Sequence, residues 1–275
     1  MKEKPVSRNE LFVKYDALKE RLRLLGKAAV AFSGGVDSTF LLYAAHEALG
    51  ENVMAVTAKS CLFPEKETSE AEDYCSELGI KHLILPVDIL SDEDIADNPA
   101  NRCYLCKKKI FGAFLDIARQ EGFSSLVEGS NLDDDNDYRP GRQAVRELGV
   151  LSPLKDAGLS KAGIRELSEA FGLPTADKPS FACLASRLPY GEKINEKKLK
   201  MIDSAEQYLR SLGFGQLRVR MHGDSARIEL IPEDFDRFMQ NDLRLMVHDR
   251  LKHLGFSYIS LDLMGYRTGS MNETL

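Results

Sequence analysis

Residues 28–39 read Ala-Ala-Val-Ala-Phe-Ser-Gly-Gly-Val-Asp-Ser-Thr. The first five of them form an apolar run of strand length, and a helical pattern extends from Asp37 to Leu49. Gly34 and Gly35, between the two, let the backbone approach a ligand closely. A helix that begins directly after a strand presents free backbone N–H groups and the positive end of its dipole. The segment therefore predicts a phosphate-binding loop.

The side chains of this loop supply further polar groups. Ser33 and Ser38 add hydroxyl donors, and Asp37 is a carboxylate suited to hold Mg²⁺ beside phosphate. The loop matches neither the GxxxxGK[ST] nor the GxGxxG pattern, which excludes the common P-loop and dinucleotide interpretations. A tight strand–helix turn without a ligand is the alternative.

Apolar strands alternate with helices through the first two thirds of the chain. This alternation predicts a parallel sheet with right-handed crossovers, buried between helices on both faces. We expect a doubly wound, mostly parallel α/β domain over residues 1–180. Its strands are predicted at 28–32, 53–57, 82–87, 125–128 and 150–154, and its helices at 9–25, 37–49, 65–78, 104–121, 139–148 and 160–171.

The pattern changes near residue 180, where Pro179, Pro189 and Gly191 interrupt it. Beyond this linker we expect a smaller α+β domain over residues 181–275. Its elements are predicted as a helix at 195–212, two strands within 217–231, helices near 233–241 and 242–254, and a last strand at 257–262.

Composition and charge narrow the function. The 275 residues include 37 basic and 43 acidic side chains, so the net charge of −6 argues against a broad nucleic-acid surface. No apolar run reaches the roughly 18 residues of a membrane span. The basic N-terminus lacks the apolar stretch of a secretory signal, so we expect a cytoplasmic protein.

The five cysteines argue for thiol chemistry or metal binding, because an odd number does not make a disulfide framework. Cys103 and Cys106 form a CxxC near a helix start, a spacing typical of redox, zinc or iron–sulfur sites. Two thiolates do not complete a zinc site. Cys183 lies in the interdomain loop, where a nucleophile could reach a bound nucleotide; a buried structural cysteine is the alternative.

The Ser33–Ser38 string, SGGVDS, resembles the pyrophosphate loop of the adenine nucleotide α-hydrolase (PP-loop) superfamily, whose members split ATP between its α and β phosphates. Residues 129–134, Gly-Ser-Asn-Leu-Asp-Asp, resemble the second ligand loop of that superfamily, and residues 57–59 stand where its members contact adenine with main chain. The resemblance implies that ATP binds at Ser33, Gly34, Gly35, Asp37, Ser38, Thr57, Gly129 and Asn131.

Four longer strings, at residues 98–111, 137–144, 177–194 and 218–230, resemble the LarE family of ATP-dependent sulfur transferases. The resemblance implies that ATP adenylates the carboxylates of a pyridinium dicarboxylate mononucleotide and that sulfur is then inserted. The product would mature into a nickel-pincer nucleotide cofactor, with partner enzymes acting before and after this one. The resemblance also implies a homo-oligomer, with a hexamer as one form.

The resemblance assigns Cys183 as the thiol that gives its own sulfur and is left as dehydroalanine. Some relatives instead use a 4Fe–4S cluster, so we expect Cys103, Cys106 and Cys183 to ligate one. The sacrificial route is one alternative, and structural or zinc-binding cysteines are the other. Three cysteine ligands leave one iron open to an extra sulfide, which lets the protein transfer sulfur repeatedly.

Charged residues of the C-terminal domain complete the expected site. Arg218 and Arg220 alternate on one strand and share a face, and paired guanidiniums suit the substrate phosphate that the resemblance assigns to them. Glu206 and Glu229 match a second metal or substrate site of the family; solvated surface charges are the alternative. An acidic cluster either binds Mg²⁺ or is a solvated loop, and it comprises Asp133, Asp134, Asp135 and Asp137.

Three other functions remain open. A tRNA thiolase of the same superfamily would require a basic RNA-binding extension. An amide-forming ligase such as NAD synthetase gives no reason for the CxxC and Cys183. A nucleotide-binding regulatory module without turnover would release no pyrophosphate.

Overall fold

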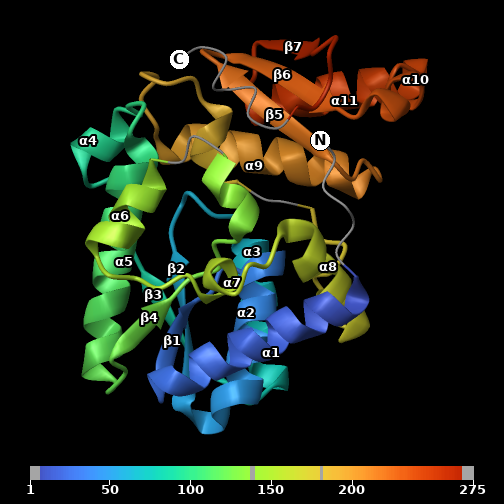
Figure 1. Cartoon of the computed structure of the whole chain (residues 1–275). Coiled ribbons are helices and arrows are strands. Elements are labelled where there is room, and N and C mark those ends of the chain that lie inside the picture. The colour runs from blue at the N-terminus through green and yellow to red at the C-terminus, as the bar shows by residue number, and fades with distance from the viewer. Residues whose placement is uncertain (1–6, 137–139, 180–181, 268–275) are drawn as a thin grey trace. The chain divides into compact units, whose positions relative to one another are not determined.

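The computed structural model describes residues 7–136, 140–179 and 182–267 (Figure 1). The chain divides into two compact units. Unit 1 comprises Met1–Ser60, Glu65–Val87 and Cys103–Phe181, and unit 2 comprises Cys61–Pro64, Asp88–Arg102 and Ala182–Leu275. The sequence analysis expected a single boundary at residue 180, with everything before it in the first domain. Unit 2 also includes Cys61–Pro64 and Asp88–Arg102, which precede that boundary. The two-domain boundary stays a prediction.

Unit 1 is built on a parallel sheet of four strands in the order β3-β2-β1-β4. Figure 1 shows α1 and α2 against one face of this sheet and α5 against the other, so the expected α/β class is confirmed. The strands are β1 (Ala28–Ala31), β2 (Val53–Lys59), β3 (Lys81–Pro86) and β4 (Ser125–Val127). The helices are α1 (Arg8–Leu25), α2 (Val36–Leu49), α3 (Glu65–Glu77), α5 (Arg102–Gln120), α6 (Gly141–Glu147), α7 (Pro153–Asp156) and α8 (Lys161–Ala170), with short 3₁₀ turns η1 (Gly50–Asn52) and η2 (Leu132–Asn136).

The strand expected at residues 150–154 is wrong. Leu151 makes only an isolated bridge with Val127, and helix α7 begins at Pro153. Proline lacks an N–H for a sheet ladder, and its fixed φ suits the first turn of a helix.

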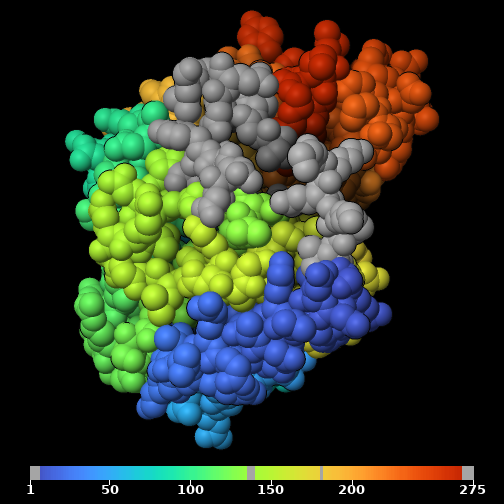
Figure 2. All heavy atoms as spheres, viewed as in Figure 1, coloured from blue at the N-terminus to red at the C-terminus, as the bar shows by residue number. Residues whose placement is uncertain are grey.

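The core of unit 1 lies between the sheet and the helices on its α1 side. Ala28, Ala29 and Val30 of β1 are fully buried. The apolar stripe of α1 packs on α2 through Leu18 and Leu22, and the opposite face of α1 is open to solvent in Figure 2. The stripe therefore serves packing within unit 1.

Unit 2 has a sheet of three strands, in which β6 pairs antiparallel with β5 and parallel with β7. The strands are β5 (Leu217–His222), β6 (Ser225–Leu230) and β7 (Tyr258–Leu261). The helices are α4 (Glu93–Ala96), α9 (Glu196–Ser211), α10 (Phe235–Phe238) and α11 (Asn241–Leu254), with 3₁₀ turns η3 (Leu184–Arg187) and η4 (Pro232–Asp234). A helix was expected at 233–241, but this region forms the 3₁₀ turn η4 and the short helix α10. Helix α4 was not predicted. Across the described residues, no helix combines the length and the apolar character that crossing a membrane requires.

Candidate active site

The phosphate loop joins β1 to α2 and is braced by its own hydroxyls. Ser33 Oγ and Ser38 Oγ lie 3.0 Å apart, and Ser38 Oγ donates to the carbonyl of Gly35 at 3.1 Å. Gly34 has a φ of +66°, and a Cβ there would lie 3.3 Å from the carbonyl oxygen of Glu67. Glycine therefore meets both the conformational and the spatial requirement at this position. The loop is held in a shape that presents the first N–H groups of α2.

The second predicted ligand loop lies against the start of α2. A Cβ on Gly129 would lie 3.1 Å from the backbone nitrogen of Ser38, so any larger residue would require the backbone at the start of α2 to shift. Asn131 Nδ2 donates to Asp37 Oδ1 at 3.4 Å. Both predicted ATP-binding loops therefore meet at the N-terminus of one helix, where anions are stabilised.

Asp37 is paired with a lysine that sequence reasoning missed. Lys161, the first residue of α8, bonds Asp37 Oδ2 through Nζ, and its backbone N–H donates to Asp133 Oδ2 at 2.7 Å. Burial raises the pKa of Asp37, and Lys161 works against that rise. No local sequence pattern predicts the pairing of Lys161 with Asp37, because the two residues lie far apart in the sequence.

The aspartates of the expected acidic cluster have separate roles. Asp134 is buried and accepts from the backbone N–H of Asn131 at 2.9 Å, which makes it part of the loop architecture. Asp133 caps the start of α8 as described. The side chain of Asp135 and the whole of Asp137 lie outside the described residues.

Two further residues that organise the loops were also missed. Glu128, at the end of β4, accepts from Ser130 N at 3.1 Å and from Ser130 Oγ at 2.9 Å. Lys178 Nζ donates to the carbonyl of Gly34 at 2.9 Å and to the carboxylates of Glu67 and Glu70. Burial lowers the pKa of Lys178, but hydrogen bonds to the two carboxylates outweigh it and raise the pKa overall. A cation therefore lies at the phosphate loop.

Thr57 supports the loop through its side chain. Its hydroxyl donates to the carbonyl of Phe32, directly before the loop, at 2.7 Å. His82 Nε2 lies 2.8 Å from the same hydroxyl oxygen, so this ring nitrogen is the donor. The end of β1 is thus fixed from β2 and β3.

Cys103 and Cys106 are partly buried and lie near the start of α5. Helix α6 packs on this turn: a Cβ on Gly141 would lie 2.8 Å from Lys107 Cδ and 3.2 Å from the carbonyl of Cys103. Tyr104 Oη donates to Glu147 of α6 at 2.7 Å. The CxxC is therefore anchored to the helix that follows the second ligand loop.

Cys183, in unit 2, precedes the turn η3. Its carbonyl accepts from Ser186 Oγ at 2.8 Å and from Arg187 Nη1 at 3.0 Å. Within the described ranges, no group of three or more His, Cys, Asp or Glu side chains is arranged to hold a metal ion.

Glu206 is buried against arginines. It accepts from Arg187 Nε at 2.9 Å and Nη2 at 3.0 Å, from Arg210 at 2.8 Å and from the backbone of Val219 at 3.1 Å. Burial would raise the pKa of Glu206, but Arg187 and then Arg210 outweigh it and lower the pKa to about 2. The expected alternative of a solvated surface charge is therefore wrong.

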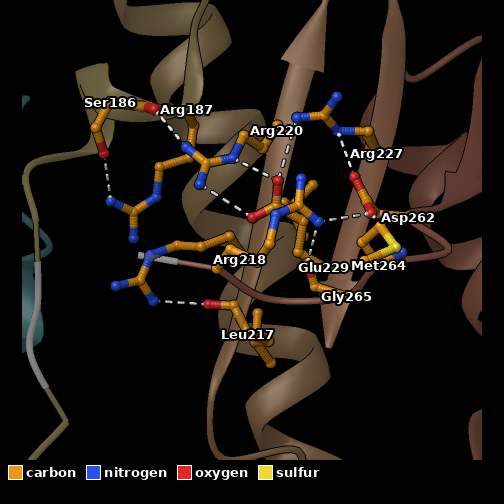
Figure 3. Close-up of polar contacts among 12 residues, drawn as sticks. Ser186, Arg187, Leu217, Arg218, Arg220, Arg227, Glu229, Asp262, Met264 and Gly265 are labelled. Atoms are coloured by element: carbon orange, nitrogen blue, oxygen red, sulfur yellow. Dashed lines mark hydrogen bonds and ion pairs between the residues drawn. The ribbon is translucent and has the colours of Figure 1, made fainter. Parts of the chain in front are cut away.

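Glu229 is likewise fully buried, which excludes a surface role for it as well. Arg220 holds it bidentately, at 2.7 and 3.0 Å, and Arg227 adds a contact at 3.2 Å (Figure 3). A metal ion at either carboxylate would have to compete with these guanidiniums.

Arg218 and Arg220 are both buried but differ in their partners. Arg220 is committed to Glu229 and donates to the carbonyl of Ser186 at 2.8 Å. Arg218 donates to the carbonyl of Leu217 at 2.7 Å and lies 5.1 Å from the ring of Tyr266 (Figure 3). Burial and then the neighbouring Arg187 cation lower the pKa of Arg218. An anion bound at Arg218 would relieve this excess of positive charge.

The buried ion pair predicts a large stability effect. Glu206→Gln leaves Arg187 buried without its countercharge, so the free energy of unfolding should fall by about 3–5 kcal/mol. Because the pKa of Glu206 is lowered, its contribution is present above the ordinary pKa of 4.5 and is lost as the pH falls toward about 2. Urea unfolding at a series of pH values should show the difference between wild type and variant shrinking over that range.

The control is Glu196→Gln on the same helix, where an exposed pair with Lys200 contributes about 0–1 kcal/mol. Equal losses in the two variants would contradict a structural role for the Glu206 pair.

Comparison with known proteins identifies the family. Residues 27–98 match the family of the queuosine biosynthesis protein QueC. An uncharacterized protein of Synechocystis sp. is 39% identical over 95% of this chain and 98% of its own length. The pyridinium-3,5-bisthiocarboxylic acid mononucleotide synthase of Lactiplantibacillus plantarum is 40% identical over 96% of both chains. The tRNA-specific 2-thiouridylase MnmA of Pelobacter propionicus is 32% identical over 55% of this chain and 52% of that protein.

The match to the L. plantarum synthase spans nearly the whole of both chains, whereas the match to MnmA covers about half of each. The partial matches agree with the resemblance of the SGGVDS loop to the PP-loop superfamily, and the full-length match decides among its members. This chain therefore belongs to the LarE family of ATP-dependent sulfur transferases.

Proposed function

We propose that this enzyme uses ATP to adenylate the carboxylates of a pyridinium dicarboxylate mononucleotide and then replaces AMP with sulfur. The observation that carries the proposal is the 40% identity, over 96% of both chains, to a synthase named for the bisthiocarboxylic acid mononucleotide. The thiolated product would serve nickel-pincer nucleotide cofactor biosynthesis, between enzymes that act before and after it. We propose a cytoplasmic homo-oligomer with a hexamer as one form.

The adenylation step follows from the two loops of unit 1. A carboxylate oxygen of the substrate attacks the α-phosphorus of ATP, and pyrophosphate leaves. The N–H groups at the start of α2 and the hydroxyls of Ser33 and Ser38 are placed to bind the pyrophosphate. Lys161 supplies a positive charge beside Asp37. The resulting acyl adenylate has a good leaving group, which a free carboxylate lacks.

Asp37 fits a magnesium ion in its chemistry, because Mg²⁺ is commonly bound through one or two carboxylates together with substrate phosphates. The carboxylate is partly buried beside the loop and contacts the amide of Asn131. When bound, Mg²⁺ would offset the negative charge of the departing pyrophosphate.

We assign the phosphate of the mononucleotide to the arginines of β5. Arg218 is the stronger candidate ligand, since it is buried near the Arg187 cation and a bound anion would stabilise its charge. Arg220 contributes by holding Glu229 in place. Bidentate recognition by a guanidinium also fixes the orientation of the substrate.

We propose that sulfur reaches the adenylate through Cys103, Cys106 and Cys183. The CxxC spacing and the third cysteine support a 4Fe–4S cluster with one open iron, and a sacrificial Cys183 is the alternative. Arg102, directly before Cys103, donates to the carbonyl of Ala185, two residues beyond Cys183, at 3.2 Å. The described residues form no three-ligand group, so the cluster remains part of the proposal.

Asp37→Asn should reduce pyrophosphate formation about 100-fold or more, as loss of one preorganised electrostatic group does. The measurement is pyrophosphate release with ATP and the mononucleotide, beside the exposed control Asp73→Asn, which should retain wild-type rates. Detection of ADP and orthophosphate in place of AMP and pyrophosphate would refute the assigned reaction.

Arg218→Ala should lower kcat/KM for the mononucleotide by about 10- to 150-fold, because a charge-assisted hydrogen bond contributes about 1.5–3 kcal/mol. The KM for ATP should stay unchanged. Arg220→Ala should in addition lower the melting temperature, because Glu229 loses its bidentate partner. The exposed control is Arg244→Ala. Weaker ATP binding with normal substrate binding would show that the arginines are misassigned.

Serine at Cys103, Cys106 or Cys183 should abolish iron binding and sulfur transfer together while pyrophosphate release continues. The measurements are iron content and visible absorption of anaerobically purified protein, with single-turnover thiocarboxylate formation. Cys75→Ala is the control, because Cys75 is a core residue whose pKa burial raises to about 12. Full single-turnover transfer by Cys103→Ser and Cys106→Ser, followed by dehydroalanine at Cys183, would establish the sacrificial route instead.

A further inference from the structure

A short segment of unit 2 holds the loop that begins at Cys183. Within this segment Asn98 is completely buried and has a φ of 56°, in the left-handed region. It is the only non-glycine residue with positive φ in the described part of the chain. Few non-glycine residues adopt this conformation, although asparagine tolerates it better than most. A buried residue in an unfavourable conformation must be held there by its contacts.

The contacts of Asn98 all run to the loop or to its own segment. Its Nδ2 donates to the carbonyl of Pro189 at 2.6 Å and, more weakly, to that of Leu188 at 3.4 Å. Its own carbonyl accepts from the backbone N–H of Gly191 at 2.8 Å. The same residue therefore binds the loop through side chain and backbone.

Arg102 completes the arrangement from the next turn. It is 3% exposed and donates through Nη1 both to Asn98 Oδ1 and, at 3.2 Å, to the carbonyl of Ala185. Its guanidinium lies 5.6 Å from the ring centre of Tyr190. We call this pair, Asn98 and Arg102 with their bonds to residues 185–191, the Asn98–Arg102 clasp. A buried cation that is paired with an amide and backbone carbonyls constrains both partners.

The clasp acts on a loop that is fixed at its other end as well. The N–H of Leu184 donates to the carbonyl of Leu62 at 2.9 Å. The carbonyl of Cys183 accepts from Ser186 and from Arg187, which is itself anchored by Glu206. The backbone on both sides of the thiol is thus held, while the side chain of Cys183 stays partly exposed.

We propose that Asn98 and Arg102 are positioning residues for Cys183, which hold its loop in the conformation that transfers sulfur. The inference rests on the proposed function, in which Cys183 takes part in the transfer. A displacement of about 1 Å can cost about 100-fold in rate, so loss of the clasp slows sulfur transfer and spares adenylation.

Asn98→Asp is the sharpest test. Aspartate tolerates positive φ and keeps an acceptor for Arg102, but it cannot donate to Leu188 and Pro189. Asn101→Asp, an exposed position in the same segment, is the matched control. Arg102→Lys, which keeps the charge and loses the planar fork, is the second variant if Asn98→Asp does not fold.

Three quantities are measured on each variant of the full chain: pyrophosphate release, single-turnover thiocarboxylate formation, and the rate at which iodoacetamide alkylates Cys183, followed by peptide mass spectrometry. We expect Asn98→Asp to keep pyrophosphate release within about twofold, to lose about 10-fold or more in sulfur transfer, and to alter the alkylation rate several-fold. Asn101→Asp should match the wild type in all three.

Parallel losses of pyrophosphate release and sulfur transfer, tracking the melting temperature, would overturn the proposal and leave a structural role only. Unchanged alkylation and transfer in Asn98→Asp would overturn it as well. If the wild-type protein releases pyrophosphate but forms no thiocarboxylate, the proposed function fails, and the alkylation rates still decide whether the clasp positions Cys183.

Discussion

Unit 2 depends on a guanidinium that is almost completely removed from water. Arg187 is 1% exposed, and such a charge is tolerated only when an opposite charge and hydrogen bonds replace its hydration. Glu206 supplies two of these bonds, and the carbonyls of Ala182 and Cys183 supply others. One side chain therefore joins helix α9 to the segment that carries the candidate sulfur-transfer thiol. The cost of breaking any one bond keeps the whole arrangement in a single conformation.

The same cluster supports the proposed recognition of an anion by unit 2. Each buried carboxylate contacts more than one arginine: Glu206 meets Arg187 and Arg210, and Glu229 meets Arg220 and Arg227. Arg218 adds a further cation to a region that already has an excess of positive charge. The net charge of the chain is −6, so the positive potential is a local property of the arginine cluster. This local charge supports the proposal that unit 2 binds a small phosphorylated substrate.

The sequence was most informative where the physics is local. Strand and helix periods predicted the sheet of unit 1, and the glycines and serines of residues 33–38 predicted the phosphate loop. Pro153 overrode an apolar run that otherwise looked like a strand. The burial of Glu206 left a signal that could have been used, because it continues the apolar helical stripe of Leu199, Ile202 and Leu209.

Contacts between distant segments could not be predicted in this way. Lys161 and Lys178 reach the phosphate loop from residues far along the chain, and no spacing rule connects them. The positive φ of Asn98 depends on contacts with backbone groups of residues 188–191, and residue propensities do not take such distant contacts into account. The cluster expected from the three cysteines also remains a prediction, because it requires segments from both units.

The path of the chain determines whether the two units can be separated by a single cut. Unit 2 includes Cys61–Pro64 and Asp88–Arg102, which in the sequence lie between stretches of unit 1. The second of these segments carries the fully buried Ile89 and Ile95. A cut near residue 180 would separate these side chains from the rest of unit 2 and expose them to water. A cut at this point would therefore not yield two complete units, because the C-terminal piece would lack part of the core of unit 2.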